Sequence, residues 1–331
     1  MTTLYVTRQG ASIRRVSQRI QVCRGQETLE TVRLRDLERL VLVGNIDLTA
    51  GALTALLEAG VETVLLSYAG KFRGRLCPAE GRNIFLRRVQ FQRYEDDAFR
   101  LQTAQTLLDA KARNGRAVLQ RYAWNHPEVQ LGDAVARMQK SQQRLRTQTS
   151  LESLLGVEGD CARAYFQALG SMMRAGFTFT TRSRRPPGDP VNALLSFGYT
   201  LLTTELTGAV AGQGMDPYVG VLHELDYGRP SLALDILEEF RQPIVDRLVL
   251  SLINRGAMQR EHFEDRGAGG VFLNDAGRPR FLEAYHRALE TEFDERESGQ
   301  RVTYRALLQR QAGRMRAAIE GTQSYAPYLM R

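Results

Sequence analysis

Short alternating runs of apolar and polar residues fill the first quarter of the chain. Runs rich in Val, Ile and Thr lie between residues 4 and 43 and are separated by turn residues, a pattern typical of strands in a small sheet. One helix is predicted over residues 49–59, with Gly60 as its stop, and a further strand over residues 63–67. A turn over residues 68–74 ends this unit, which we interpret as a small β-rich domain.

Beyond Asn83 the apolar positions follow helical spacing to the end of the chain. A helix is predicted from residue 85 to 114, with Gly115 as its break. Residues 131–150 are polar and predict either an exposed helix or a connector. Residues 191–210 are apolar on nearly every side apart from Asn192 and Glu205, which places this helix in the core. We therefore predict an α+β fold, with a β domain over residues 1–83 and an all-helical domain over residues 84–331.

Other features narrow the class of protein. No uncharged apolar stretch reaches the ~18–20 residues of a membrane span, and the first residues lack the pattern of a signal peptide, so we expect a cytoplasmic protein. The chain has three cysteines and no C-x-x-C pair. This pattern argues against a disulfide framework and against a cysteine-rich metal site. The sequence contains no phosphate-binding loop, dinucleotide fingerprint, serine-esterase elbow or H-E-x-x-H motif.

The net charge of the chain points towards an anionic partner. There are 45 basic and 37 acidic residues, a net charge of +8, and only three of the basic residues are lysines. Arginine binds phosphate through a planar bidentate fork, so this excess is compatible with nucleic acid. A GC-rich genome, which encodes Arg in place of Lys, explains the same composition.

A basic loop precedes the long apolar helix. Arg182, Arg184 and Arg185 have no acidic residue closer in sequence than Asp189, and prolines stiffen the segment. Such a loop at the start of a helix can hold phosphates. The alternative is a solvated basic loop without a ligand.

Carboxylates and one histidine form a second candidate site. Glu158 is predicted to open a helix, His223 lies shortly before a turn, and a following helix carries Asp235 one turn from Glu238 and Glu239. Two or three carboxylates with one imidazole suit a divalent cation, and the imidazole favours Mn²⁺ over Mg²⁺. Each residue taken alone also fits an ordinary structural or solvated position.

The sequence resembles the CRISPR-associated integrase family, the large subunit of the spacer-acquisition machinery. Three segments carry the resemblance, and they occur in the expected order and spacing: residues 184–196, 218–223 and 228–241. Weaker similarity includes residues 86–90 and the pair Lys111 and Asn114. The resemblance extends from Leu4 to about Arg316.

This resemblance implies a function and a set of partners. It implies a homodimer, with dimerisation through the N-terminal domain, a small ferredoxin-like adaptation subunit that completes a heterohexamer, and in some systems an end-trimming nuclease. It implies Glu158, His223 and Glu238 as ligands of Mn²⁺ or Mg²⁺, Asp235 as a second acidic group beside them, and Arg182, Arg184 and Arg185 as DNA contacts.

The reaction implied is metal-dependent strand transfer, in which the 3′-hydroxyl of a short duplex attacks a phosphodiester of the repeat, with nuclease activity in isolation. Two alternatives stay open: a metal-dependent nuclease that acts on branched DNA in repair, and a non-catalytic DNA-binding scaffold. Some members of the family have Asp at the third ligand, and Glu239, next to Glu238, is the alternative third ligand. A continuous helical wheel from Asp235 puts Glu238 at the edge of the buried arc and Glu239 on the polar side, which favours Glu238.

Overall fold

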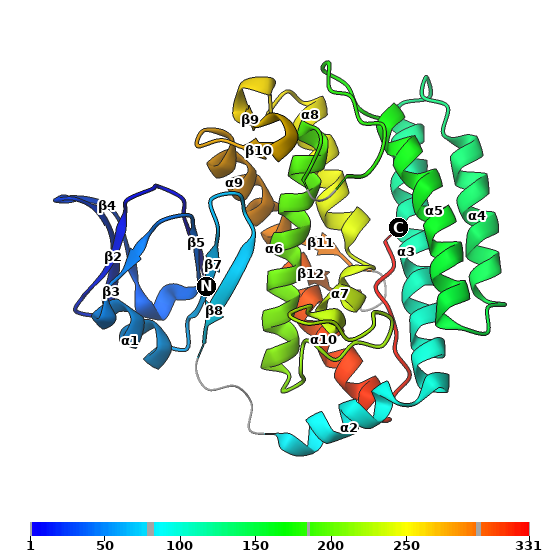
Figure 1. Ribbon diagram of the computed structural model, residues 1–331, viewed down its shortest axis with the longest axis horizontal. Helices are drawn as coiled ribbons and strands as arrows, with labels where there is room; N and C mark the ends of the chain where they lie inside the picture. Colours follow the sequence, from blue (N-terminus) through cyan, green and yellow to red (C-terminus); the bar gives the residue numbers. More distant parts are fainter. Residues whose placement is uncertain (1, 78–82, 184–185, 296–298, 331) are drawn as a thin grey trace.

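The computed structural model describes residues 2–77, 83–183, 186–295 and 299–330. Strands form the N-terminal part and mainly helices the C-terminal part, so the predicted α+β class is confirmed (Figure 1). Within these described ranges, no helix combines the length and the apolar character that crossing a membrane requires.

Two four-stranded sheets make up the N-terminal part. Their strands are β1 (Thr2–Val6), β5 (Leu37–Val43), β7 (Glu62–Leu66) and β8 (Phe72–Leu76) in the first sheet, and β4 (Glu27–Arg33), β3 (Arg19–Arg24), β2 (Ser12–Val16) and β6 (Asp47–Leu48) in the second. The predicted helix is α1 (Ala50–Glu58), which Thr49 caps by accepting a hydrogen bond from the Ala52 amide. Strand β8 was not predicted, because Gly74 interrupts its pattern; it pairs antiparallel with β7.

The C-terminal part is mainly helical, and the prediction that it is all-helical is wrong in detail. Two short antiparallel pairs, β9 (Phe263–Asp265) with β10 (Val271–Leu273) and β11 (Phe293–Asp294) with β12 (Arg301–Val302), lie among its helices. The helices are α2 (Ile84–Tyr94), α3 (Asp97–Asn125), α4 (Gly132–Leu145), α5 (Leu151–Ser171), α6 (Pro190–Gly212), α7 (Ser231–Leu237), α8 (Arg247–Asn254), α9 (Gly277–Glu290) and α10 (Tyr304–Ile319). A π-helix, η2 (Arg241–Asp246), leads into α8.

The expected helix break at Gly115 is wrong. Helix α3 continues through Gly115, and the chain instead breaks between α2 and α3, where the Asp96 side chain caps the new helix. A Cβ atom on Gly115 would lie 2.9 Å from a carbon of Met138 and 3.3 Å from the ring of Tyr165. The glycine therefore allows α4 and α5 to pack closely on α3, as their neighbouring positions in Figure 1 show.

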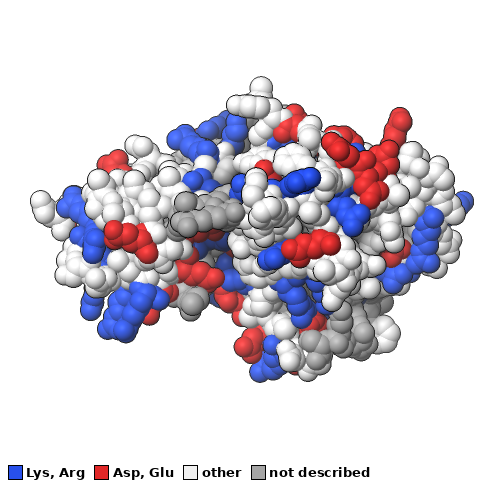
Figure 2. Space-filling model, turned by 90° about the horizontal axis from the view of Figure 1, so that it is seen from below, with Lys and Arg blue, Asp and Glu red and all other residues white. Residues whose placement is uncertain are grey.

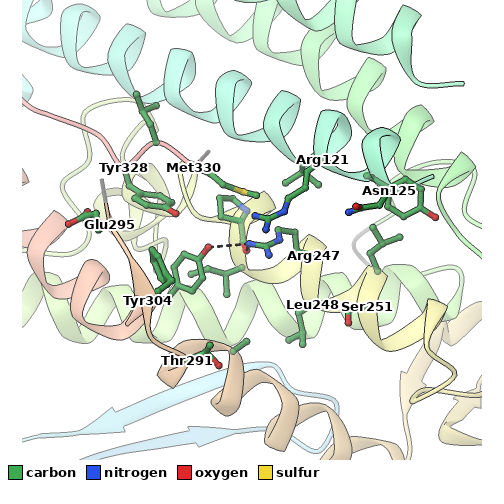
Figure 3. A pocket seen from close by; sticks show the side chains of 18 of the residues that line it. Arg121, Asn125, Arg247, Leu248, Ser251, Thr291, Glu295, Tyr304, Tyr328 and Met330 are labelled. Carbon is green, nitrogen blue, oxygen red and sulfur yellow. Dashed lines mark hydrogen bonds between the residues drawn. The ribbon is translucent and has the colours of Figure 1, made fainter. Parts of the chain in front are cut away.

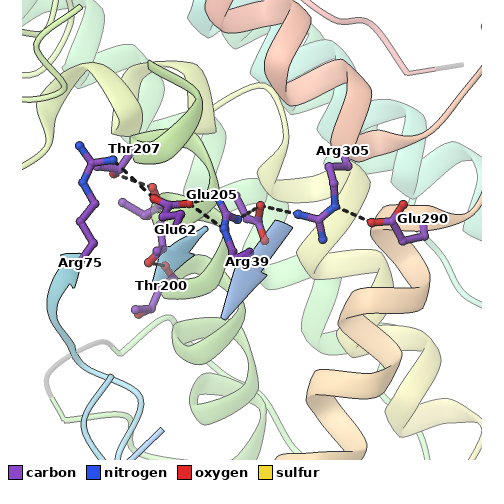
Figure 4. A network of polar contacts seen from close by, with 10 residues as sticks. Arg39, Glu62, Arg75, Thr200, Glu205, Thr207, Glu290 and Arg305 are labelled. Atoms are coloured by element: carbon purple, nitrogen blue, oxygen red, sulfur yellow. Dashed lines mark hydrogen bonds and ion pairs between the residues drawn. The ribbon is translucent and has the colours of Figure 1, made fainter. Parts of the chain in front are cut away.

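Helix α6 runs through the centre of the molecule, as its apolar sequence predicted (Figure 1). Its buried polar residue Glu205 binds Arg39 of β5 and Arg305 of α10, and Arg39 also binds Glu62 of β7 (Figure 4). This ion network joins the first sheet to the helical part. The domain boundary at residues 83 and 84 and the role of the N-terminal part in dimerisation stay predictions.

Candidate functional site

Three side chains from separate elements meet at a buried ion cluster. Lys111 comes from the middle of α3, Glu158 from α5, and Glu238 from the residue that ends α7. The Lys111 ammonium Nζ lies 2.5 Å from Glu158 Oε1 and 2.6 Å from Glu238 Oε2. Glu158 lies inside α5, which begins at Leu151, and does not open the helix as predicted. A single cation thus joins two of the predicted metal ligands.

Arg241 completes the charge balance of this cluster. It is the first residue of the π-helix, and its Nη2 lies 3.2 Å from Glu238 Oε1. Burial would raise the pKa of Glu238, but Arg241, Lys111 and His223 together lower it to about 2. Burial would likewise lower the pKa of Lys111, yet Glu238 and Glu158 hold it above its usual value. Both groups are therefore charged across the physiological range.

Asp235 lies directly against His223, one of the predicted ligands, and orients its imidazole ring. Its Oδ1 lies 2.6 Å from His223 Nδ1 and also accepts from the His223 amide, while Oδ2 accepts from the amides of Val221 and Leu222. A carboxylate can only accept, so the ring donates from Nδ1 and a neutral ring keeps its lone pair on Nε2. Gly220 makes this close approach feasible, because a Cβ there would lie 2.7 Å from Asp235 Oδ2.

The fit of a divalent cation to these residues is partial. Glu158 and Glu238 hold one cation between them, the Lys111 ammonium, and an imidazole supported by a buried carboxylate is a common arrangement for a metal ligand. In the described part of the chain, however, no three His, Cys, Asp or Glu side chains form a group that could hold a metal ion. The donor types fit a metal, and the three-ligand set is not assembled around one point.

The position expected for Glu239 is wrong. Its side chain is fully buried, where it accepts hydrogen bonds from the Tyr325 hydroxyl, the Tyr328 amide and Gln311 Nε2. Burial raises its pKa to about 7 against these hydrogen bonds. The helical wheel failed because α7 ends at Leu237 and the next residues turn more tightly, with the Glu238 and Phe240 amides bonded three residues back. The C-terminal segment also covers Glu239. Glu239 thus anchors the C-terminal segment, whereas Glu238 faces Lys111.

Of the three arginines of the basic loop, the structure describes Arg182. Arg184 and Arg185 lie outside the described residues. Arg182 is engaged with α6, since it donates to Asn192 Oδ1 at 2.7 Å and to Ser196 Oγ at 2.9 Å. Its guanidinium also lies over the ring of Tyr199, on which Arg241 stacks as well. A DNA contact by Arg182 stays a prediction, and its hydrogen bonds show that it also orders the start of α6.

A large open cavity of about 1260 Å³ lies outside this ion cluster, and none of the predicted site residues that the structure describes lines it. Arg121 of α3 and Arg247 of α8 point into it side by side (Figure 3). Arg247 donates to the hydroxyl of Tyr304, and in the described ranges neither arginine pairs with a carboxylate. On the face shown in Figure 2, basic and acidic side chains are interspersed. The two arginines therefore place in this cavity two positive charges that no carboxylate of the described residues neutralises.

Sequence reasoning missed Lys111 and Arg241 as members of the site. Lys111 entered only through its weak resemblance together with Asn114, although a lysine is rare in this arginine-rich chain. Asn114, one turn further along α3, binds the Glu239 carbonyl, the Tyr328 carbonyl and the Met330 amide. The spacing of this pair is thus explained, because one face of α3 holds both the ion cluster and the C-terminal segment.

Comparison with known proteins gives consistent matches over the whole chain. The family model for CRISPR associated protein Cas1 matches residues 4–287. A CRISPR-associated endonuclease Cas1 of Thermus thermophilus is 37% identical over 308 residues, covering 93% of this chain and 89% of that protein. A Cas4 exonuclease and Cas1 endonuclease fusion of Geobacter sulfurreducens is 37% identical over 326 residues; the match covers 96% of this chain and 58% of the fusion.

Solved structures give the same result. A Cas1 protein from Thermotoga maritima superposes with a TM-score of 0.84 at 25% identity, covering 99% of this chain and all of that one. A chain of a partial Cas6-RT-Cas1–Cas2 complex superposes with a TM-score of 0.68 at 25% identity, covering 100% and 99%. The similarity to both structures extends over both the strand-rich and the helical parts.

Proposed function

Because the chain belongs to the CRISPR-associated Cas1 family, we propose that it is a metal-dependent DNA integrase. Its reaction joins the 3′-hydroxyl of a short duplex to a phosphodiester of the repeat, and in isolation it cuts DNA. The observation that carries this proposal is the convergence of Lys111, Glu158, Glu238 and Arg241 in one buried cluster, on the helical part of the chain. Its curated relatives are named endonucleases.

The chain's own residues have distinct roles in this reaction. Glu158, His223 and Glu238 would hold Mn²⁺ or Mg²⁺, which supplies Lewis-acid stabilisation of the charge on the reacting phosphate and hydroxyl. Asp235 fixes the imidazole of His223 with Nε2 available. Arg241 pairs with Oε1 of Glu238, while Lys111 pairs with Oε2 of the same carboxylate. Each donor is thus oriented by a neighbour before substrate arrives.

A protein nucleophile is not part of the proposal. Cys161 is the cysteine nearest this cluster in sequence, and burial raises the pKa of its thiol to about 11, so it is a neutral thiol at physiological pH. In-line attack by a DNA hydroxyl needs no covalent intermediate with the protein.

DNA is the substrate that the charge distribution supports. Arg121 and Arg247 face the same cavity without carboxylate partners among the described residues, and phosphates can neutralise them. Partner proteins follow from the relatives: the solved complex contains Cas2, and the Geobacter protein carries a Cas4 exonuclease. We infer a homodimer with the N-terminal part as interface, a small adaptation subunit, and an end-trimming nuclease as partners.

A strand-transfer assay tests this function. A labelled duplex with a free 3′-hydroxyl is incubated with a supercoiled repeat plasmid, the chain and its small adaptation subunit, with Mn²⁺ or with EDTA. We expect joined products only with Mn²⁺, and none from a matched duplex that ends in a 3′-dideoxynucleotide. Nicking without joining would instead favour the branched-DNA nuclease, and a metal-indifferent gel shift without products would favour the scaffold.

A further inference from the structure

The cation between Glu158 and Glu238 is the side chain of a lysine, Lys111, in a chain that otherwise uses mainly arginine. All but three of the 45 basic residues are arginines, yet a lysine lies between Glu158 and Glu238. An ammonium is a compact point charge on a flexible stem, whereas a guanidinium is a planar fork that binds carboxylates in pairs. A lysine can therefore leave a carboxylate by rotating its side chain, which the buried arginine Arg241 cannot do as easily.

The geometry indicates what this lysine does. Its Nζ lies at similar distances from both carboxylates, 2.5 and 2.6 Å, which is the position of a bridging cation. Glu238 is almost fully buried and Glu158 is 21% exposed, so without a cation their mutual repulsion would be poorly screened. Meanwhile the described His, Cys, Asp and Glu side chains form no three-membered metal group.

We propose that Lys111 is an internal substitute for the divalent cation, holding Glu158 and Glu238 in place in the metal-free protein and competing with the metal for them. This inference rests on the proposed function, since it takes both carboxylates to be metal ligands. Displacement of the ammonium exchanges one positive charge for two, so the site changes from charge-balanced to net positive. A net positive site attracts the phosphate of DNA, which couples metal binding to substrate binding.

The test measures Mn²⁺ binding and stability without measuring activity. Free Mn²⁺ is quantified by electron paramagnetic resonance during titration of the wild-type chain, Lys111→Met and the matched control Lys140→Met, whose lysine is exposed on α4. We expect Lys111→Met to bind Mn²⁺ at least roughly 10-fold more tightly, because loss of one partner from a buried ion cluster leaves charge that the metal neutralises. Lys140→Met should match the wild type.

Thermal unfolding of the same samples gives an independent result. In EDTA, Lys111→Met should melt below the wild type, and Mn²⁺ should raise its melting temperature by more than it raises that of the wild type. If Lys111→Met does not fold in EDTA, Lys111→Arg is used instead; it keeps the charge in a fork that releases carboxylates less readily, and it should bind Mn²⁺ more weakly than the wild type.

The outcomes separate this inference from the proposed function. If folded Lys111→Met binds Mn²⁺ with the same affinity as the wild type, the role of Lys111 is overturned and the metal site still stands. Where Lys111→Arg is used instead, equal affinity for that variant and the wild type has the same meaning. Mn²⁺ binding by Lys111→Met alone would support competition in its strongest form. The absence of Mn²⁺ binding in both chains would overturn the metal site and this inference together.

Discussion

Two buried ion clusters of this chain have opposite designs. The network between the sheet and α6 pairs Arg39, Arg75 and Arg305 with Glu62, Glu205 and Glu290 (Figure 4). The cluster on α3, α5 and α7 pairs Lys111 and Arg241 with Glu158 and Glu238. Both have equal numbers of positive and negative groups, so charge balance does not distinguish them.

The cations and their surroundings do distinguish the two clusters. The network uses arginine throughout, and its central Glu205 is 7% exposed and bound from both sides. The α3 cluster contains a lysine, has Glu158 at its rim and an oriented histidine nearby. Arginine forks fix geometry, whereas the flexible stem of a lysine leaves room for exchange. We therefore assign stability to the first cluster and chemistry to the second.

The largest effect is expected in the network. Glu205→Gln should lower the free energy of unfolding by about 3–5 kcal/mol, because it leaves Arg39 and Arg305 partly uncompensated in a buried position. Urea unfolding measures this, with the exposed Glu261→Gln as control. If Glu205→Gln loses no more free energy of unfolding than the control does, the network does not stabilise the fold.

The next effect concerns the support of His223. Asp235→Asn should reduce strand transfer by about 10- to 100-fold, because an amide no longer fixes the imidazole tautomer. The Mn²⁺ titration serves as the second readout, since a positioning residue should also weaken metal binding. Wild-type Mn²⁺ affinity in a folded Asp235→Asn chain would argue that the pair is only structural.

A smaller loss of stability is expected beside the site. Glu239→Gln should lower the free energy of unfolding by about 1–3 kcal/mol, since its amide group would face the donors of Tyr325, Tyr328 and Gln311. Hydrogen exchange of the Tyr328 and Met330 amides should accelerate. Unchanged exchange would mean that Glu239 does not anchor the C-terminal segment.

The smallest effect is expected in the arginine cavity. The double variant Arg121→Gln and Arg247→Gln should bind duplex DNA with a weaker salt dependence. The slope of the logarithm of the binding constant against the logarithm of the salt concentration should fall in magnitude by about 2, since each phosphate contact contributes about 0.9. The control is Arg266→Gln with Arg287→Gln, because these arginines already pair with Glu264 and Glu283. Equal slopes for both double variants would mean that Arg121 and Arg247 do not contact DNA phosphates.

Much of the fold follows from local sequence signals. Strands bounded by turn residues, the capped helix α1 and the apolar helix α6 were all predicted, because their patterns record local geometry and burial. Gly115 was misread because a glycine inside a helix can serve either termination or close packing, and only the neighbours Met138 and Tyr165 decide which.

The site was harder to predict because its contacts join distant parts of the chain. Glu158, His223 and Glu238 were predicted as ligands from their residue types and by resemblance, but the contact of Lys111 with Glu158 depends on how α3 packs against α5. The burial of Glu239 depends on the turn after α7 and on a C-terminal segment almost 90 residues away in sequence. A helical wheel assumes one regular helix and includes no residues from other segments, so it could not predict this burial.

The most direct test of the assignment compares two isosteric substitutions on the same preparations, Glu158→Gln and Glu205→Gln. Strand transfer and urea unfolding are measured for both. For Glu158→Gln we expect a loss of strand transfer of at least about 100-fold, with a smaller loss of stability than that of Glu205→Gln, because Glu238 still pairs with Lys111. Glu205→Gln should show the reverse. It should lose much stability, and at temperatures below its melting point its rate of strand transfer should stay within a few fold of the wild-type rate. Strand transfer by Glu158→Gln close to the wild-type rate would contradict the account.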